Sequence, residues 1–162
     1  MPTWSHAHPI IVHFPIALLL VAPLLVLLGL LWPAQRTGVH ASALVLLLLG
    51  TCLAVLAVIT GMAAAGAAGR SPELLLALDS HEHLAKQAAL LYSCLSLAFV
   101  VMHLLSRRWR QGTGPRWLIA AHLLWLAASL GASLLLIRTG HLGGRMVHEL
   151  GFHAGAVPGH QN

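Results

Sequence analysis

HPIIVHFPIALLLVAPLLVLLGLLWP, residues 8–33, is an apolar run that is long enough to cross a lipid bilayer. A membrane-spanning helix needs about 20 mostly apolar residues, and Ile10 to Trp32 supplies them before Pro33 favours a helix end. His8 and His13 stand at the start of this run. The run therefore predicts a first transmembrane helix, and it raises the question of why two imidazole side chains lie at its N-terminal end.

The composition of the whole chain is that of a membrane protein. Of its 162 residues, 58% are hydrophobic and only 8% are charged, whereas a soluble domain carries roughly 25% charged residues. The mean hydropathy is +0.83. The net charge of +5 does not indicate nucleic-acid binding, because the few basic residues lie between apolar runs without a clustered basic face. Cys52 and Cys94 lie inside apolar runs, and no CxxCH motif for covalent haem attachment is present in the sequence.

Three further windows are apolar enough to span a bilayer, so we expect four spans at about 10–32, 41–65, 84–105 and 117–137. Backbone N–H and C=O groups in lipid must be satisfied within the protein, which favours helices over open strands. The sequence predicts an all-α, polytopic four-helix bundle that forms a single membrane domain over residues 1–162.

The distribution of positive charge predicts how this bundle is oriented. Loops rich in Lys and Arg stay on the cytoplasmic side, and the loop between the third and fourth spans holds four arginines and no acid. Arg36, between the first two spans, falls on the same side. The opposite side holds four basic residues and all four acidic residues. We therefore expect a multi-pass protein of the bacterial inner membrane, with both termini on the periplasmic side.

Residues 138–162 are expected to form a periplasmic tail. Gly140, Gly143 and Gly144 predict that the fourth helix stops and that the chain reverses. After this reversal, residues 145–150 are expected to form a short helix along the membrane surface.

Nine of the twelve histidines fall on the outer side, and their convergence from distant parts of the chain is the main functional signal. Neutral imidazole is the commonest metal ligand, and ionisable groups at membrane depth are costly and point to function. The remaining three are His40, His103 and His122, and the last two are interpreted as interfacial side chains. The outer set consists of His6, His8, His13, His81, His83, His141, His148, His153 and His160.

The first functional hypothesis is a b-type haem subunit that passes electrons between a periplasmic donor and a membrane partner or quinone. His13 and His83 would be the axial ligands, with His8 or His148 as substitutes, because opposed ligands come from different helices. The chain would hold and orient the haem, and the iron would supply the chemistry. His83 has a second interpretation, either as a residue of the capped first turn of the third helix or as a polar side chain at the membrane interface.

Arginine side chains are expected to complete this haem site. Arginine pairs with carboxylates bidentately, so Arg138 and Arg145 would meet haem propionates that point outward. The small-residue stretch GMAAAGAAG, residues 61–69, would leave room for a flat macrocycle or would serve close helix packing.

Two alternatives remain open. A cofactor-free structural or assembly subunit of a larger membrane complex would use its histidines as hydrogen-bond partners between helices, and would pack against other subunits or a second copy. The motifs GxSxG, HExxH and the P-loop are absent from the sequence, so an accessory subunit is favoured over a stand-alone enzyme. A copper or zinc site would need three or four convergent imidazoles, drawn from His6, His8, His13, His81, His83, His141 and His148.

Three motifs resemble a bacterial family of four-helix membrane proteins of unknown function. They are HPIIVHFPIAL (8–18), ITGMAAAG (59–66) and TGHLGGRMVHELG (139–151), and the family patterns are an opening HPxxVHFPIAL and a closing TGxxGGxxV. The resemblance implies the four-span fold over nearly the whole chain, and His8 and His13 match it directly. Family members often carry an aromatic residue at the position of His148. Members of the family often occur together with respiratory cytochromes and cupredoxin-like proteins, and this association implies a redox role with redox partners.

Overall fold

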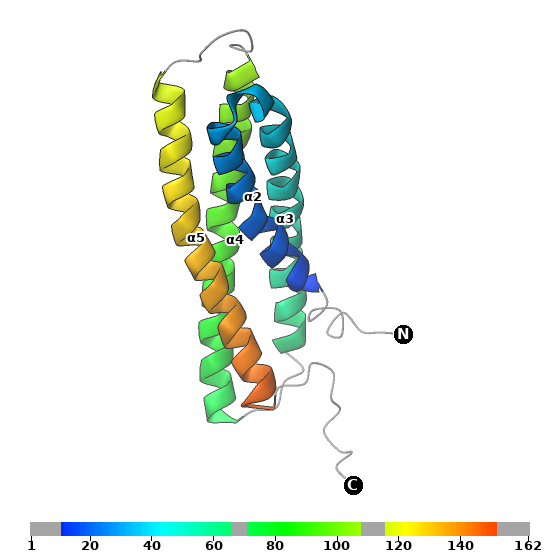
Figure 1. Ribbon diagram of the computed structural model, residues 1–162. Helices are drawn as coiled ribbons and strands as arrows, with labels where there is room; N and C mark the ends of the chain where they lie inside the picture. The colour runs from blue at the N-terminus through cyan, green and yellow to red at the C-terminus, as the bar shows by residue number, and fades with distance from the viewer. Residues whose placement is uncertain (1–10, 66–70, 108–115, 152–162) are drawn as a thin grey trace.

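The structure is a computed structural model that describes residues 11–65, 71–107 and 116–151. These ranges fold into four α-helices and one short 3-10 helix, which are α2 (His13–Leu31), η1 (Pro33–Gln35), α3 (Arg36–Ala65), α4 (Pro72–Ser106) and α5 (Arg116–His148) (Figure 1). Each of the four α-helices is long and apolar enough to cross a membrane. The prediction of an all-helical chain with four candidate spans is therefore confirmed for the described residues.

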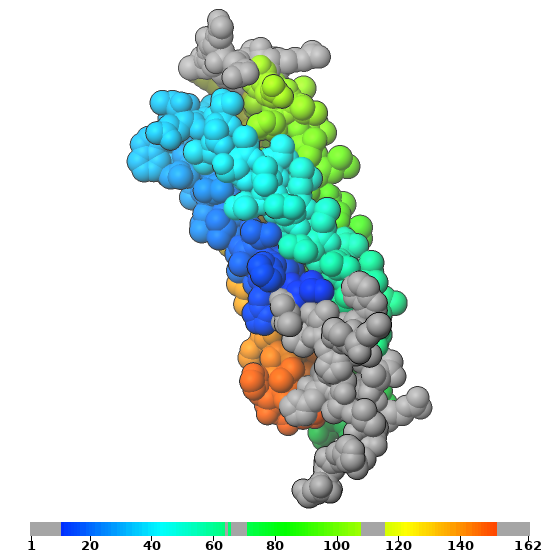
Figure 2. Space-filling view, turned by 90° about the vertical axis from the view of Figure 1, so that its right-hand side faces the viewer, coloured from blue at the N-terminus to red at the C-terminus, as the bar shows by residue number. Residues whose placement is uncertain are grey.

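The four helices lie side by side and form a ring in cross-section. α2 packs chiefly against α3 and α5, and α4 packs against the same two helices, so α2 and α4 are diagonal to each other. Successive helices alternate in direction (Figure 1), and because they are long and packed side by side the molecule is elongated (Figure 2). We name the end where α4 begins and α5 ends the outer end, and the end that holds η1 the inner end, after the orientation that the charges predict.

Helix α4 begins well before the expected span. Ser71 is its N-cap, and the Ser71 hydroxyl accepts a hydrogen bond of 3.3 Å from the backbone N–H of Leu74. Pro72 occupies the first turn, where its missing N–H costs nothing. His81 and His83 consequently lie inside a continuous helix, so the interpretation of His83 as part of a capped first turn is wrong.

Helix α5 runs through all three glycines at which it was expected to stop. It continues to His148, so the predicted reversal at Gly143 and the predicted surface helix over residues 145–150 are wrong. A glycine inside a helix costs only about 1 kcal/mol relative to alanine, and close packing offsets this cost. A Cβ atom at Gly143 would lie 3.2 Å from Cε1 of His81 on α4. Residues 152–162 of the expected tail lie outside the described part of the chain.

The core of the bundle runs along its whole length. Leu19, Val26, Leu47, Tyr92 and Phe99 have no exposed surface, and they bring together α2, α3 and α4. Large aliphatic side chains also cover the outside, as expected where lipid replaces water around transmembrane helices.

Polar side chains join the helices inside the apolar core. The hydroxyl groups of Thr51 on α3 and Ser96 on α4 are 2.8 Å apart, and those of Tyr92 on α4 and Ser133 on α5 are 3.1 Å apart. Such bonds stabilise helix association inside a membrane, and they fix the register of α4 against its two neighbours.

Candidate functional site

The two predicted axial ligands, His13 and His83, do not face each other. Both side chains are exposed, and they belong to α2 and α4, the diagonal helices of the ring. The ring of His83 accepts a hydrogen bond of 2.9 Å from the amide of Gln87, one turn further along the same helix. The described residues therefore give this pair no shared interior position.

His81, two residues before His83, is the outer histidine that is tied into the bundle. Its side chain is half-buried, and Nδ1 donates a hydrogen bond of 3.0 Å to the carbonyl oxygen of Thr139 on α5. The absence of a side chain at Gly143 allows this close approach of α4 and α5. His81 is thus held in one orientation by its neighbour helix, whereas His83 is not.

The remaining predicted residues lie along the last turns of α5 and are exposed. Arg145 pairs through Nε with the carboxylate of Glu149 at 3.0 Å, an exposed contact within one helix turn. His8 lies outside the described residues. Within residues 11–65, 71–107 and 116–151, no group of three or more His, Cys, Asp or Glu side chains is arranged to hold a metal ion. The exposed set is Arg138, His141, Arg145 and His148.

The inner end holds a pair of histidines that the sequence analysis did not select. His40 on α3 and His122 on α5 are each only 3% exposed. Their rings are stacked, with centroids 5.0 Å apart and planes at 24°. The ring of His122 therefore points into the bundle, and its depth relative to the membrane interface stays a prediction.

The position of His122 in the helix could have revealed this burial. Leu118, His122, Trp125 and Ser129 are all buried and recur at intervals of three or four residues along α5, which is the spacing of one helix face. On α3, the buried residues His40, Ala43 and Leu47 follow the same spacing.

Each ring of the pair is fixed by one hydrogen bond to a main-chain carbonyl. Nδ1 of His122 donates to the carbonyl oxygen of Leu118 at 2.7 Å, and Nε2 of His40 donates to that of Val26 on α2 at 3.2 Å. Because a carbonyl oxygen only accepts, these bonds set the tautomer of both rings. The second nitrogen of His122, Nε2, is buried and has no hydrogen-bond partner among the described residues.

One aromatic side chain and a glycine lie against the histidine pair. The ring of Phe99 on α4 meets His40 and His122 edge-on, at centroid distances of 5.8 and 6.0 Å. Gly29 on α2 lies against the ring of His40, and a Cβ atom there would be 2.5 Å from Nε2. The pair is thus surrounded by all four helices.

One positive side chain lies at the same end of the bundle. Arg36, one helical turn before His40 on α3, donates from Nε to the carbonyl oxygen of Gly29 at 3.2 Å. This bond anchors the guanidinium group beside the α2 segment that packs on His40. The pair therefore combines two imidazoles, one lone pair without a partner, an aromatic wall and one nearby positive charge.

The comparison with known proteins gives a family and no relative of known activity. A model for the family described as "Predicted membrane protein (DUF2231)" matches residues 5–156. No curated protein and no solved structure matches the chain. The match covers both terminal motifs and all four helices, as the resemblance implied. The chain belongs to this family of predicted membrane proteins, whose function is unknown.

Proposed function

We propose that this chain is a membrane protein that binds a copper ion between His40 and His122, inside the inner end of the bundle. The observation that carries the proposal is Nε2 of His122, which is buried without a hydrogen-bond partner while a second imidazole lies against its ring. A buried polar group without a partner costs about 1–3 kcal/mol, and its presence in a native protein asks for an explanation. A metal ion that accepts this lone pair would remove the cost.

The tautomers of the two rings leave one lone pair on each for the ion. His122 carries its proton on Nδ1 and offers Nε2, whereas His40 carries its proton on Nε2 and offers Nδ1. Metal-binding histidines commonly donate their other N–H group to a carbonyl in this way. Coordination would turn the two stacked rings toward a shared ion.

The number of ligands and the local charge favour Cu(I) over Zn²⁺. Protein-bound zinc is almost always four-coordinate in structural sites, and the described residues contain no group of three or more ligating side chains. The guanidinium of Arg36, anchored to Gly29, repels a doubly charged ion more strongly than a singly charged one. Cu(I) carries one charge and is stable with two ligands, and imidazole suits copper.

A b-type haem at the outer end is a second candidate, with His81 in place of His83. The observation that favours it is the bond from Nδ1 of His81 to the carbonyl oxygen of Thr139, because ligating histidines are held by such bonds. In this candidate Nε2 of His81 would bind the iron, and the chain would serve electron transfer. We favour copper because the inner pair supplies two ligand nitrogens, whereas the outer end supplies one, from His81.

The membrane context of this proposal follows from the charge distribution. Five arginines lie in or next to the two connections on one side, and all four acids lie on the other. We therefore propose that the protein resides in the bacterial inner membrane with both termini outside. The copper pair would then be near the cytoplasmic face, from which it would receive or deliver the ion.

The test is Cu(I) binding by protein purified in detergent, measured without oxygen by competition with a chromophoric Cu(I) chelator. Wild-type protein is expected to retain one copper ion per chain. His122→Leu and His40→Leu, which keep the side-chain volume, are expected to lose this copper. His83→Leu is the matched control, since His83 is exposed on α4, and it should bind as the wild type does.

An absorption spectrum of the same sample, oxidised and then reduced with dithionite, separates the two candidates. Copper that remains in the His40→Leu/His122→Leu double variant would overturn the copper proposal. Sharp reduced haem bands that His81→Leu abolishes, and that His83→Leu keeps, would establish the haem candidate instead.

A further inference from the structure

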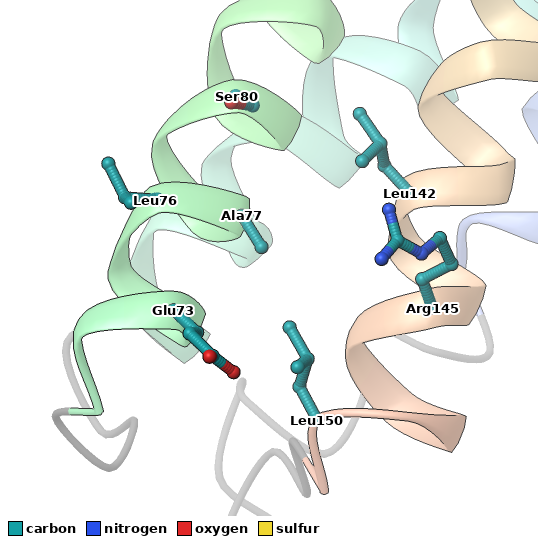
Figure 3. A pocket seen from close by; sticks show the side chains of 7 residues that line it. All are labelled: Glu73, Leu76, Ala77, Ser80, Leu142, Arg145 and Leu150. Atoms are coloured by element: carbon teal, nitrogen blue, oxygen red, sulfur yellow. The ribbon is translucent and has the colours of Figure 1, made fainter.

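A pocket of about 520 Å³ opens between the first turns of α4 and the last turns of α5. It lies at the outer end, at the opposite end of the bundle from His40 and His122, and it is independent of the copper proposal. α4 contributes Glu73, Ala77 and Ser80, and α5 contributes Leu142 and Arg145. Leu150 closes the pocket from the segment that follows α5 (Figure 3).

The two walls of the pocket carry opposite charges that do not meet. Figure 3 shows the carboxylate of Glu73 directed from α4 toward α5, and the guanidinium of Arg145 directed from α5 toward α4. Glu73 and Arg145 form no ion pair with each other, because the one ion pair of Arg145 among the described residues is the bond from Nε to Glu149. The terminal nitrogens of Arg145 therefore remain for a ligand.

The charge of Glu73 is favoured by its position. It lies in the first turn of α4, where the positive end of the helix dipole stabilises an anion. Ser80, two turns further along the helix, adds a hydroxyl group to the same wall. The pocket thus offers a cation site, an anion site and a hydroxyl group.

Between these polar groups the pocket is apolar. Leu142 and Leu150 are half-buried, and Leu76 at the edge is 72% exposed. The inner part of the pocket, at Ser80 and Leu142, begins four or five residues beyond the apolar windows of α4 and α5. At about 1.5 Å per residue, this is within the headgroup region of a bilayer. A fitting occupant is therefore amphipathic and carries one positive and one negative group at a short separation.

We propose that this pocket binds the headgroup of a zwitterionic phospholipid with a primary amine, namely phosphatidylethanolamine. The ammonium group would donate to the carboxylate of Glu73, and the phosphate would accept from the guanidinium of Arg145 and from the hydroxyl of Ser80. The glycerol backbone and upper acyl chains would lie against the leucines. A primary ammonium has three N–H donors, whereas the trimethylated amine of phosphatidylcholine has none, so Glu73 distinguishes the two lipids.

The test is native mass spectrometry of the full chain released from nanodiscs that contain equal amounts of phosphatidylethanolamine, phosphatidylcholine and phosphatidylglycerol. Wild-type protein is expected to retain phosphatidylethanolamine over phosphatidylcholine about tenfold, the size of one hydrogen bond to a charged group. In Glu73→Gln this preference should fall to about twofold or less, because a neutral amide holds the ammonium weakly. In Arg145→Gln the retention of all three lipids should fall.

Two matched variants control for general effects of charge. Glu82→Gln removes an acid of α4 that pairs with Lys86 outside the pocket, and Arg138→Gln removes an exposed arginine of α5. Both should keep the wild-type lipid preference. Both pocket residues are exposed, so thermal unfolding of Glu73→Gln and Arg145→Gln should match that of the wild type.

Three outcomes would overturn the proposal. The first is equal retention of phosphatidylethanolamine and phosphatidylcholine by the wild type. The second is a preference that survives Glu73→Gln. The third is stronger retention of the anionic phosphatidylglycerol by the wild type, which would show that Arg145 acts without Glu73.

Discussion

At the inner end of the bundle His40 and His122 are each 3% exposed and stack at 5.0 Å, whereas at the outer end His83, His141 and His148 are exposed on the helix surfaces. The outer end has more histidines, and the inner end has the histidines that neighbouring helices enclose. The number of ligand-type residues at one end of a bundle is therefore a poor guide to a site. The orientation of each side chain relative to the helix axis decides whether two imidazoles meet.

The glycines show the same difference between the ends. Gly29 lies directly against the buried ring of His40, and Gly143 lies against the half-buried ring of His81. A ring with neighbours on every side has less room to move than a half-buried ring, which can shift toward the surface. The inner contact should therefore be the more sensitive to added volume.

Gly29→Ala should have the largest effect on stability. The new Cβ atom would be 2.5 Å from Nε2 of His40, so the ring must move and its bond to Val26 is strained. We expect a loss of about 2 kcal/mol, typical of overpacking in a core. The measurement is the free energy of unfolding in mixed micelles.

Gly38→Ala is the control for that substitution, because a Cβ atom at Gly38 meets nothing within 4 Å. It should leave stability unchanged or raise it by up to about 1 kcal/mol through helix propensity. Equal stabilities of Gly29→Ala and Gly38→Ala would mean that the ring of His40 is not tightly enclosed.

His122→Leu should stabilise the metal-free protein. The substitution removes a buried nitrogen without a partner, which is worth about 1–3 kcal/mol. It also removes the bond to Leu118, so we expect a net gain of about 1 kcal/mol. The same unfolding experiment in the presence of a copper chelator measures it.

A loss of stability in His122→Leu would instead assign His122 a structural role in holding the helices together. The combination of higher stability and lost copper binding is the pattern expected for a residue kept for function.

Gly143→Ala should have a smaller effect at the outer end. The new Cβ atom would be 3.2 Å from Cε1 of His81, so the half-buried ring must shift by a few tenths of an ångström. We expect Gly143→Ala to be less stable than Gly144→Ala by about 1 kcal/mol. The comparison with Gly144→Ala cancels the gain in helix propensity, because nothing lies within 4 Å of a Cβ atom there. If the two variants unfold alike, the contact between His81 and α5 is loose.

Ser133→Ala should have the smallest effect on stability. Ser133 lies midway between the two ends of the bundle. The substitution removes the bond of 3.1 Å between the hydroxyl groups of Tyr92 and Ser133. Hydrogen bonds between transmembrane helices average about 0.6 kcal/mol, and we expect a loss of that size in the unfolding experiment. A loss as large as that of Gly29→Ala would mean that the middle of the bundle, rather than the inner end, controls helix association.

The helical class was predictable, and the helix ends were not. Apolar windows indicate only the part of a helix that crosses lipid. α4 begins earlier, at Pro72, because Ser71 caps it, and a hydropathy profile does not detect a capping residue. α5 passes Gly143 because a neighbouring helix packs there. That contact is with His81, which is distant in the chain, so the sequence around Gly143 does not predict it.

The candidate site was missed for a related reason. Helices of this bundle are apolar on all sides, with leucines at both buried and exposed positions, so hydropathy alone does not distinguish the inward face from the lipid face. The polar residues mark the inward face instead. His122 and Ser129, seven residues apart, are both buried on one face of α5, and this face, read together with His40, would have indicated the inner pair.

By itself the sequence determined the membrane environment, the four apolar helices and the family, because these follow from composition, run length and motifs along the chain. Only the tertiary structure decided which histidines meet. The stacking of His40 on His122 depends on how α3 and α5 are rotated within the ring, and the packing of side chains from all four helices sets that rotation. The lone pair of His122 without a partner is a consequence of this packing, and it is the feature on which the proposed copper site rests.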